Sequence, residues 1–471
     1  MLTTLSFLQK GEPWPPKAEV ARLDQYRANK LLFESKHDEV FKDWLRLLRD
    51  DQKATLEFIL NWHKRLSLLW CDLLLGEPPV YTAGEKGSAE QKTVERLVSE
   101  NDLNVVAYEV ALDVSRYGDG LFKVRLEDGS SVITGQPPDL WFPVIDRADV
   151  RKIEAHVLAW TFDEKVKRTL RSDLLLKFLR VEVHRKGVIH NRLFRLGDPD
   201  RTIEREESLE RFFPDVPEAE QTGVNDFLVV YAPGVRATDR LHGFDDYRDL
   251  ETLVQEMEVR LAQISRILDK HADPSMAGPP HEITTDDAGN PVYVGGSRYF
   301  EVEEGGHVPQ YVTWDGKLDA AFKEIEELKE QLYFVSETTP AAFGQLKQGL
   351  AESGSALRRL MMAPLAKVAR IRTRFDPALK KALKVAADLE RANGKDTPEI
   401  STVQIQWQDG LPPDPKEQAE TEEVRVRSGT TSRSSAIRRL DGVTQDEAES
   451  ELGHALEEQP ALGNQKIKAE S

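Results

Sequence analysis

The sequence has little cysteine, no long hydrophobic run and less positive than negative charge. Its single cysteine among 471 residues, Cys71, excludes an internal disulfide and agrees with assembly in a reducing cytoplasm. The longest apolar run, from Leu66 to Leu75, is broken by Asp72 and is far shorter than the roughly 18 residues that indicate a membrane span. The start, Met1 to Leu8, lacks the basic flank and the long apolar core of a signal peptide. We therefore expect a protein without a membrane anchor and without a secretion signal.

Positive charge is in short supply, because 64 lysines and arginines face 82 aspartates and glutamates, giving a net charge of −18. Domains that grip DNA are usually basic, since they neutralise phosphates with lysine and arginine. A solubilising surface is one interpretation of this acidity, and taken alone the acidity argues against contact with nucleic acid. In a conduit, however, an acidic wall would repel a duplex and deny it sites of attachment. The charge therefore fits DNA that slides better than DNA that is bound.

The sequence also lacks the short motifs of several enzyme classes. It contains no Gly-x-x-x-x-Gly-Lys-Ser/Thr loop of a Walker-type ATPase and no Gly-x-Ser-x-Gly elbow of a serine hydrolase. Gly118-Asp-Gly120 lacks the third glycine of a dinucleotide fingerprint and precedes a predicted strand, so we interpret it as a turn. His281-Glu282 begins like a zinc-protease motif but lacks the second histidine four residues on. We therefore expect no enzyme activity and no cofactor.

Isolated histidines and one pair of carboxylates are the remaining candidates for chemistry. His63 lies on the apolar face of a predicted helix, which is more typical of a histidine at the edge of a core than of a ligand. His184 and His190 flank a predicted hairpin turn without Cys, Asp or Glu at ligand spacing, so we expect no metal site. Asp245-Asp246 could serve a metal-dependent nuclease, but among 82 acidic residues such pairs arise by coincidence. We interpret this pair as a solvated turn and keep the nuclease as an alternative hypothesis.

The first half of the chain predicts an α+β lobe, because apolar spacing changes from helical to alternating near Leu121. The chain exceeds the roughly 250 to 300 residues at which a single core stops growing, so several subdomains are expected. Residues 1–16 show no periodicity and are expected to cover a neighbour or to be disordered, and residues 198–223 to form a surface excursion. The expected helices are Lys17–Arg49, Gln52–Leu74 and Glu90–Tyr117, and the expected strands, mostly antiparallel, are Leu121–Leu126, Leu140–Val144, His156–Phe162, Leu175–His184, Val188–Leu196 and Asp226–Ala232.

A heptad-like seam predicts a long helix from Phe244 to Lys270, about 40 Å in length at 1.5 Å per residue. The pattern alone is also typical of a buried helix in an ordinary bundle. Residues 273–312 are rich in glycine and proline, with short β-like pieces at Val292–Val294 and Tyr299–Val302. The seam consists of Tyr247, Leu250, Val254, Met257, Leu261, Ile264 and Leu268.

The next stretch predicts an acidic amphipathic helix from Lys317 to Tyr333, a loop, and a very long helix. Helical spacing stops over residues 336–349 and resumes after Gly354, until Asn393-Gly394 supplies a left-handed stop. Prolines at 364 and 377 lie inside the long helix and predict kinks. A strand at Val403–Trp407 and three helices at Glu417–Arg427, Ser434–Leu440 and Gln445–Leu456 follow, and residues after Pro460 are expected to be disordered.

The order of helix, glycine-containing loop and long kinked helix resembles the portal proteins of bacteriophages. Five further motifs, in order over residues 20 to 455, resemble the same family, closest to portals of long-tailed phages. In that family the subunits form a ring at the special capsid vertex. The motifs are Leu73-Leu-Leu-Gly-Glu-Pro-Pro79, Gly118-Asp-Gly-Leu-Phe-Lys-Val124, Trp141-Phe-Pro-Val144, Gly243-Phe-Asp-Asp246 and Ser353-Gly-Ser-Ala-Leu357.

The resemblance implies a portal fold with a wing of helices and antiparallel sheet, a two-helix stem, a small β clip and a helical crown. The regions that it implies are an arm and wing at 1–243, the first stem helix at 244–270, the clip at 271–313, the second stem helix at 314–335, the tunnel loop at 336–353, the long kinked helix and return to the wing at 354–413, the crown at 414–457 and a disordered tail at 458–471.

The resemblance also implies partners and channel residues. It implies a ring of twelve copies, assembled in the host cytoplasm and placed in the virion. Double-stranded DNA is expected to pass through this ring without sequence specificity during packaging and ejection. The expected protein partners are the terminase large subunit, a later head-completion adaptor, and the major capsid and scaffold proteins. The alternative is a helical cytosolic adaptor without a DNA channel. The channel residues implied are Thr339, Pro340, Phe343, Gly344, Gln345, Lys347 and Gln348 in the tunnel loop, with Glu324, Glu327 and Glu330 as an acidic wall.

Overall fold

The structure is a computed structural model that describes most of the chain. The chain divides into two compact units. The first unit comprises residues 1–338 and 364–409, and the second comprises residues 339–363 and 410–471. Each is described by itself. The residues described are 1–41, 59–169, 172–197, 201–272, 276–278, 284–285, 291–292, 299–301, 318–345, 354–408, 410–411 and 415–469.

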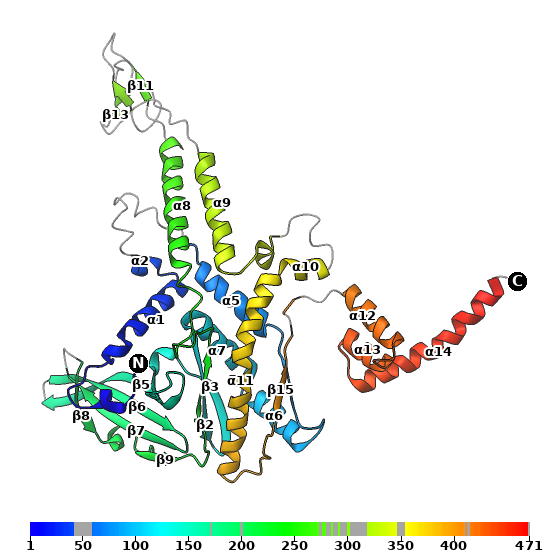
Figure 1. The fold of residues 1–471 in the computed structure, drawn as a ribbon. Helices are drawn as coiled ribbons and strands as arrows, with labels where there is room; N and C mark the ends of the chain where they lie inside the picture. Colours follow the sequence, from blue (N-terminus) through cyan, green and yellow to red (C-terminus); the bar gives the residue numbers. More distant parts are fainter. Residues whose placement is uncertain are drawn as a thin grey trace. The chain divides into compact units, whose positions relative to one another are not determined.

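The first unit contains a six-stranded antiparallel sheet in the order β4-β5-β6-β7-β8, with β9 paired to β7 (Figure 1). Alternating side chains give it two apolar faces, because neighbouring residues of a strand point to opposite sides. Val157 opposite Val183 and Leu179 opposite Phe194 belong to one face. The alternation had predicted four of these strands but not β8 and β9. Their bounds are β4 Trp141–Ile145, β5 Ile153–Thr169, β6 Ser172–Arg185, β7 Val188–Leu196, β8 Ile203–Glu207 and β9 Ala219–Gln221.

The first sixteen residues lie on one face of this sheet. Leu2 pairs with Val144 in a single bridge, and a short 3-10 helix, η1 (Leu5–Leu8), follows. Trp14 is buried, with its ring centroid 4.7 Å from that of Phe142. The expectation that this arm covers a neighbour or is disordered is therefore wrong. Its apolar residues complete the core of its own sheet, and their extended and 3-10 backbone leaves no helical period to detect.

The predicted N-terminal helices are shorter and more divided than expected. The helix expected over Lys17–Arg49 ends at residue 33, two residues before Ser35, which adopts a left-handed φ of 65°. The part of that prediction from residue 42 on lies outside the described residues. Asn61 caps α5 by accepting from Lys64 N, so that helix begins ten residues later than predicted. The bounds are η2 Lys17–Glu19, α1 Val20–Phe33, α2 His37–Val40 and α5 Trp62–Leu75.

The helix expected over Glu90–Tyr117 is two helices, α6 (Ala89–Glu100) and α7 (Leu103–Tyr117). They are divided at Asn101 and Asp102, and Asp102 has a φ of 45°. The buried side chain of Asn101 donates to Leu97 O at 2.9 Å and accepts from Ile133 N at 2.7 Å. This contact with Ile133 of a neighbouring strand accompanies the break between the two helices. Helical spacing alone does not reveal such a break.

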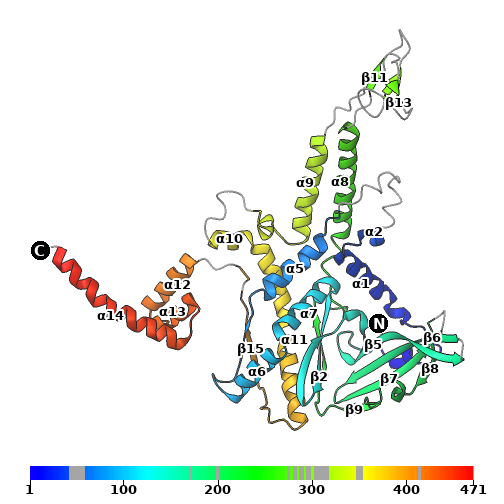
Figure 2. The same cartoon turned by 180° about the vertical axis from the view of Figure 1, so that it is seen from behind.

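A second sheet of three strands, in the order β10-β2-β3, lies beside α7 and α11 (Figure 2). The ring of Phe122 on β2 lies 5.8 Å from that of Phe375 on α11. A further pair joins β1 to β15, which lie more than 300 residues apart in the sequence. Neither β1 nor β3 was predicted. The bounds are β1 Val80–Ala83, β2 Asp119–Glu127, β3 Ser130–Gly135, β10 Val229–Pro233 and β15 Val403–Gln406.

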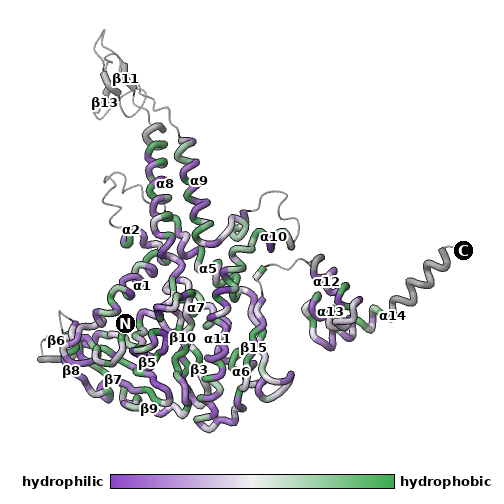
Figure 3. The backbone as a smooth tube through the Cα atoms, viewed as in Figure 1, coloured by the Kyte–Doolittle hydropathy of each residue, from purple (hydrophilic) through white to green (hydrophobic). Residues whose placement is uncertain are grey.

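Two long helices, α8 (Glu251–Ala272) and α9 (Leu318–Val335), run side by side in opposite directions (Figures 1 and 2). Helix α8 begins seven residues after the predicted Phe244, because residues 244–250 form turns. Figure 3 shows apolar and polar residues mixed along both helices. Among the described helices, none is long and apolar enough to cross a membrane.

Between these helices the structure describes four short strands. β11 (Met276–Gly278) pairs in parallel with β14 (Tyr299–Glu301), and β12 (Thr284–Thr285) pairs antiparallel with β13 (Pro291–Val292). The β-like pieces expected from 292 and from 299 coincide with the end of β13 and with β14, while residues 293–298 and 302–317 lie outside the described residues.

The long helix predicted from Gly354 is divided at Met361 into α10 (Gly354–Leu360) and α11 (Met362–Ala392). Pro364 falls in the first turn of α11, where a missing backbone N–H has no partner to lose, whereas Pro377 lies inside that helix. The predicted stop is confirmed, because Gly394 has a φ of 86° and Lys395 N donates to Glu390 O at 3.1 Å.

The second unit ends in three helices, α12 (Pro415–Arg427), α13 (Arg433–Asp441) and α14 (Gln445–Ala469). Glu422 of α12 accepts from Arg439 of α13 at 2.6 Å and from Arg425 at 2.9 Å. The tail expected to be disordered from residue 458 is instead helical as far as Ala469. The residues after Pro460 include alanine, leucine, glutamine and lysine, which favour helix even without an apolar stripe.

Candidate functional site

The start of β2 and the segment before α8 meet where three glycines bring two parts of the chain into backbone contact. Gly234 N donates to Gly118 O at 2.7 Å. A Cβ on Gly243 would lie 2.0 Å from Gly118 O, so no larger residue fits without moving backbone. Gly118 also has a left-handed φ of 77°, which favours glycine. Two motifs more than 120 residues apart in the sequence, at Gly118 and at Gly243, therefore form one junction.

A buried carboxylate, Asp119, holds this junction. It accepts hydrogen bonds from the Tyr26 hydroxyl, from the Tyr231 hydroxyl at 2.5 Å and from Gly243 N at 3.0 Å, and its Oδ2 lies 2.6 Å from His242 Nδ1. Burial by itself would raise the pKa of Asp119. The positive charge of His242 and the three side-chain hydrogen bonds outweigh it and hold that pKa below its ordinary value. One side chain thus joins α1, β2, β10 and the segment before α8.

The carboxylate pair Asp245-Asp246 is engaged in holding the chain rather than solvated, which corrects the expectation from sequence. Asp245 accepts from Tyr247 N at 3.0 Å and from Arg248 N at 2.9 Å, and burial raises the pKa of its carboxyl group. Asp246 accepts from Ser115 Oγ at 2.6 Å and pairs with Lys367 Nζ at 2.7 Å. Within the described part of the chain, no three metal-ligating side chains gather into a group that could hold an ion.

Tyr247, four residues before α8, packs into the core beside α5. Its side chain is fully buried, and its hydroxyl lies 2.8 Å from Ser67 Oγ of α5. Its ring lies 4.9 Å from the ring of His63. His63 is itself fully buried rather than at the edge of a core, and burial, with the nearby His37, lowers the pKa of its imidazole to about 3. The first residue of the predicted seam therefore belongs to the core below α8.

Along α8 the predicted seam becomes more exposed with distance from this base. Val254, Met257 and Ile264 are buried, Leu261 is half-buried, and Leu268 is 47% exposed. Leu250 is also buried, at the last position before the helix. Within the described residues, the side chain of Leu268 near the end of α8 is therefore left largely uncovered.

A buried acid on α8 ties the stem to the N-terminal helices. Glu258 is 4% exposed, and its Oε1 lies 2.7 Å from His37 Nδ1 and accepts from Leu60 N at 2.9 Å. Sequence reasoning did not single out this glutamate, because an acid at a helical position is usually on a solvated face.

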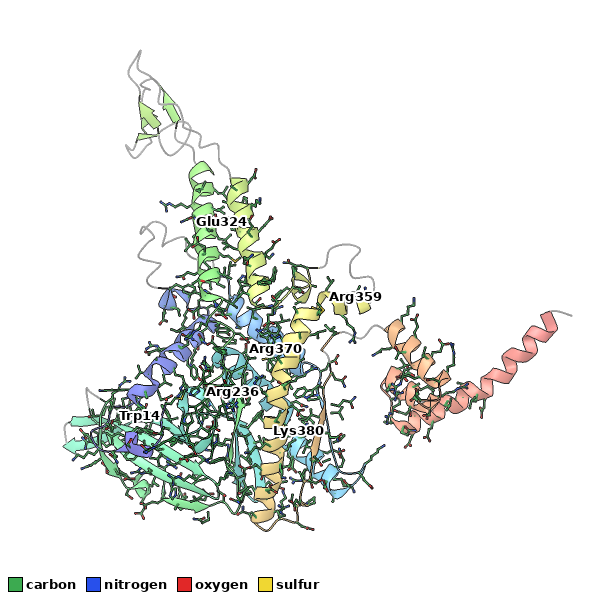
Figure 4. The ribbon with its side chains drawn as sticks, viewed as in Figure 1. Trp14, Arg236, Glu324, Arg359, Arg370 and Lys380 are labelled. Atoms are coloured by element: carbon green, nitrogen blue, oxygen red, sulfur yellow. The ribbon has the colours of Figure 1, made fainter. Side chains whose placement is uncertain are left out.

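The three acids expected to line a channel are not equivalent. Glu324 pairs with Arg260 of α8 at 3.1 Å, and Arg260 also pairs with Glu256 at 2.9 Å (Figure 4). Glu327 and Glu330 are exposed, and the nearest ion-pair partner of Glu327 is Lys323 at 4.0 Å. Glu324 is thus directed to the other stem helix, and the two remaining acids are free to face solvent or a ligand.

Helix α9 ends in a cap that the sequence did not predict. Thr338 N donates to Tyr333 O at 2.9 Å, and Ser336 Oγ donates to Leu332 O at 2.6 Å. Glu337 takes the left-handed position of this cap, with a φ of 59°, where glycine is usual. Its carboxylate pairs with Arg370 of α11, whose side chain Figure 4 labels.

The loop that follows begins with a 3-10 helix, η5 (Pro340–Phe343), and a left-handed glycine. Gly344 has a φ of 76°, and Gln345 N donates to Pro340 O at 3.0 Å. Gly344 and Gln345 are exposed, Phe343 is half-buried, and Thr339 Oγ1 lies 3.9 Å from Met361 Sδ. Lys347 and Gln348, also expected in the channel, lie outside the described residues.

Comparisons with known proteins were made against families, curated proteins and solved structures. A family model described as phage portal protein, SPP1 Gp6-like, matches residues 17–461. No curated protein matches the chain. A chain of the structure titled "Virion of native gene transfer agent (GTA) particle" is 12% identical, with a TM-score of 0.40 and coverage of 93% of this chain and 96% of that one. A chain of "Neck of empty GTA particle computed with C6 symmetry" is also 12% identical, with a TM-score of 0.40 and coverage of 80% and 89%.

Proposed function

The chain belongs to the SPP1 Gp6-like family of phage portal proteins, and from this premise we propose that it forms a ring of twelve copies around an axial channel for double-stranded DNA. Its role as a portal follows from the family. What we propose is the number of subunits in the ring, the path of the DNA and the residues that face the DNA. The match over nearly the whole chain, from residue 17 to 461, is the observation that carries it.

The order of elements supports the assignment of regions. The antiparallel pair α8 and α9 suits a stem, the short strands between them suit a clip at 271–313, and helices α12 to α14 suit a crown. The clip would meet the terminase large subunit during filling and a head-completion adaptor afterwards. The wing, in the same proposal, meets the major capsid and scaffold proteins. The assembled ring would be built in the host cytoplasm and remain in the virion.

The family is structural, and we infer that this chain has no catalytic activity of its own. The carboxylates that suggested a nuclease support this inference, because Asp245 accepts from two backbone amides and Asp246 pairs with Lys367. Both are engaged in fixing the segment that enters the stem. Movement of DNA would then be driven by the ATP-dependent motor that docks on the ring.

Particle mass tests the ring directly. Mass photometry of the purified protein is expected to show a species near twelve times the 53.4 kDa subunit mass, and negative-stain images are expected to show closed rings. A helical adaptor has no reason to close into a ring. Monomers and dimers alone, at every protein concentration and salt concentration tried, would rule out the portal assembly.

The tunnel loop is tested by deleting residues 341–349 in a packaging system. Rings are expected to form, because the deletion removes no residue of α8 or α9, while DNA packaging or retention fails. Lys347→Ala is expected to be milder and to affect DNA movement alone, since a flexible point charge contacts phosphates only transiently. Replacing the same nine residues by glycine and serine is the matched control for loop length. A deletion variant that fills capsids and retains genome like the parent would remove the tunnel-loop assignment.

A further inference from the structure

The two faces of the six-stranded wing sheet are covered by segments with different charge. On one face, Phe7 and Trp14 of the N-terminal arm pack on Phe142. On the opposite face, Phe212 packs on Phe178, and Leu209 belongs to the same cluster. Because successive residues of a strand point to opposite sides, these two clusters lie on either side of one layer.

The face with the arm carries a groove of about 430 Å³ with an aromatic floor and a basic rim. Trp14, Phe142 and Tyr117 are among its lining residues. Of the residues described there, Asp139 is the one acid, and Lys177 is paired with Asp163 at 2.6 Å. The four cations that line it are Arg27, Lys30, Lys177 and Arg201, and we call this site the basic groove.

Three of the four cations lack a partner within the described residues. Arg27 and Lys30 project from α1, and Arg201 lies in the turn before β8; all three are exposed and none makes an ion pair with a described residue. In a chain with a net charge of −18, three unpaired cations around one aromatic groove indicate a site for an acidic partner.

The opposite face carries the complementary charge in residues 209–220, which we call the acidic ridge. In this stretch Arg211 is the one base, and its guanidinium packs over Phe178 and Phe212. Pro214 and Pro217 are exposed. Four carboxylates are also exposed and make no ion pair with a described residue. They are Glu210, Asp215, Glu218 and Glu220.

We propose that the acidic ridge of one subunit docks on the basic groove of the next subunit in the ring. A closed ring is built head to tail, so each subunit must present two different and complementary patches on opposite sides. The carboxylates would pair with Arg27, Lys30 and Arg201, and the exposed prolines suit an aromatic floor. This inference rests on the proposed ring, and it names the wing surfaces that close it.

Complementary charge reversal tests the contact. Variant A carries Arg27→Glu and Lys30→Glu, and variant B carries Glu210→Lys and Asp215→Lys. Alone, each presents like charges across every contact, so the protein concentration needed for half-assembly, measured by mass photometry, is expected to rise by at least about tenfold. An equimolar mixture pairs reversed groove with reversed ridge and native groove with native ridge. It is expected to restore rings in which A and B alternate, which native mass spectrometry detects as equal numbers of the two subunits.

The controls separate this inference from the ring itself. The double reversal Lys86→Glu with Lys92→Glu, at exposed positions near β1 and α6, changes net charge like variant A and is expected to leave assembly unchanged. High salt is expected to reduce the difference between A and the parent, since exposed charges are screened. If the parent forms rings and variants A and B each assemble as well as it does, the contact is wrong while the portal assignment stands. If the mixture of folded A and B fails to restore rings, the contact is equally wrong.

Discussion

His63 is buried below the stem and remains neutral there, which makes the stability of this region depend on pH. Its pKa is lowered from 6.5 to about 3 on folding, so its contribution to stability is fully present above pH 6.5 and is lost as pH falls toward 3. Within that window each pH unit costs about 1.4 kcal/mol, because the unfolded chain binds one more proton. In His63→Phe, which keeps the ring against Tyr247, the free energy of unfolding is expected to fall less steeply between pH 6.5 and 4.

Urea unfolding at several pH values measures this slope. His156, whose pKa is also about 3, remains in the variant and leaves a residual dependence. The matched control is His454→Phe, at an exposed position of α14, which is expected to keep the parent slope. A parent slope in His63→Phe would mean that His63 does not carry the acid sensitivity of the stem base.

Gly243 is the residue of this junction at which an added side chain is least tolerated. Gly243→Ala places a methyl group 2.0 Å from Gly118 O, so the two backbones must separate and the hydrogen bond from Gly243 N to Asp119 is strained. We expect a loss of more than about 2 kcal/mol in the free energy of unfolding, as for other substitutions that force close-packed groups apart. Gly453→Ala in α14 is the control, with no atom within 4 Å of the new methyl group. Equal melting temperatures for the two variants would contradict the junction.

At the scale of the element, the proposed stem carries apolar side chains on α8 that the described residues leave partly exposed. Leu261 is only half-buried in the subunit, so Leu261→Asp is expected to disturb the isolated fold little and to bury a charge when subunits associate. We expect loss of rings with a circular dichroism spectrum close to that of the parent. Val105→Asp, which replaces a 60% exposed residue of α7, is the control. Intact rings of the Leu261 variant would place this face of α8 away from subunit contacts.

Elements whose signal is local could be predicted from the sequence, and elements set by distant contacts could not. The stripe of α9 and the stop at Gly394 depend on neighbouring residues, and both were predicted. The break at Asn101 depends on a hydrogen bond to Ile133, and the fold of the arm depends on Phe142, so neither left a local pattern. Glu337 is a further example, because a left-handed cap usually carries glycine and a glutamate at this position does not indicate one.

The candidate site divides in the same way. Spacing found the seam of α8 and the loop after α9, because those patterns repeat along one helix. It missed the role of Asp119, whose partners come from three other segments, although the motif that contains it was noted. It also grouped Glu324 with Glu327 and Glu330, since sequence does not show that Arg260 of α8 lies 3.1 Å away.

At the scale of the whole molecule, the acidity of the stem is expected to keep DNA moving. If Glu327 and Glu330 face the channel, Glu327→Lys with Glu330→Lys in every subunit places a ring of positive charge around the duplex. Packaging is expected to slow, and the defect is expected to ease as salt rises, which single-particle packaging rates at several salt concentrations would measure.

Two control variants separate an effect of charge in the channel from other effects of the substitutions. Glu85→Lys with Glu154→Lys makes the same change in net charge at exposed wing positions and is expected to leave packaging unchanged. Glu324→Lys is expected to act on the packing of α9 against α8 instead, because it replaces one of the two carboxylates that pair with Arg260. A slowdown that does not respond to salt would mean that Glu327 and Glu330 face a neighbouring subunit rather than DNA.

The hydrogen-bonded group of Asp119, Tyr26, Tyr231 and His242 also limits how this sequence can change over generations. Replacing the aspartate alone leaves the Tyr26 hydroxyl and His242 without this acceptor and leaves the Tyr231 hydroxyl with Leu241 O. Replacing any one donor leaves a buried negative charge less well satisfied. Every single step away from the present arrangement is therefore disfavoured, even where a fully apolar replacement of the whole group would be stable. Descendants of this chain are expected to keep the four residues together or to exchange them as a set.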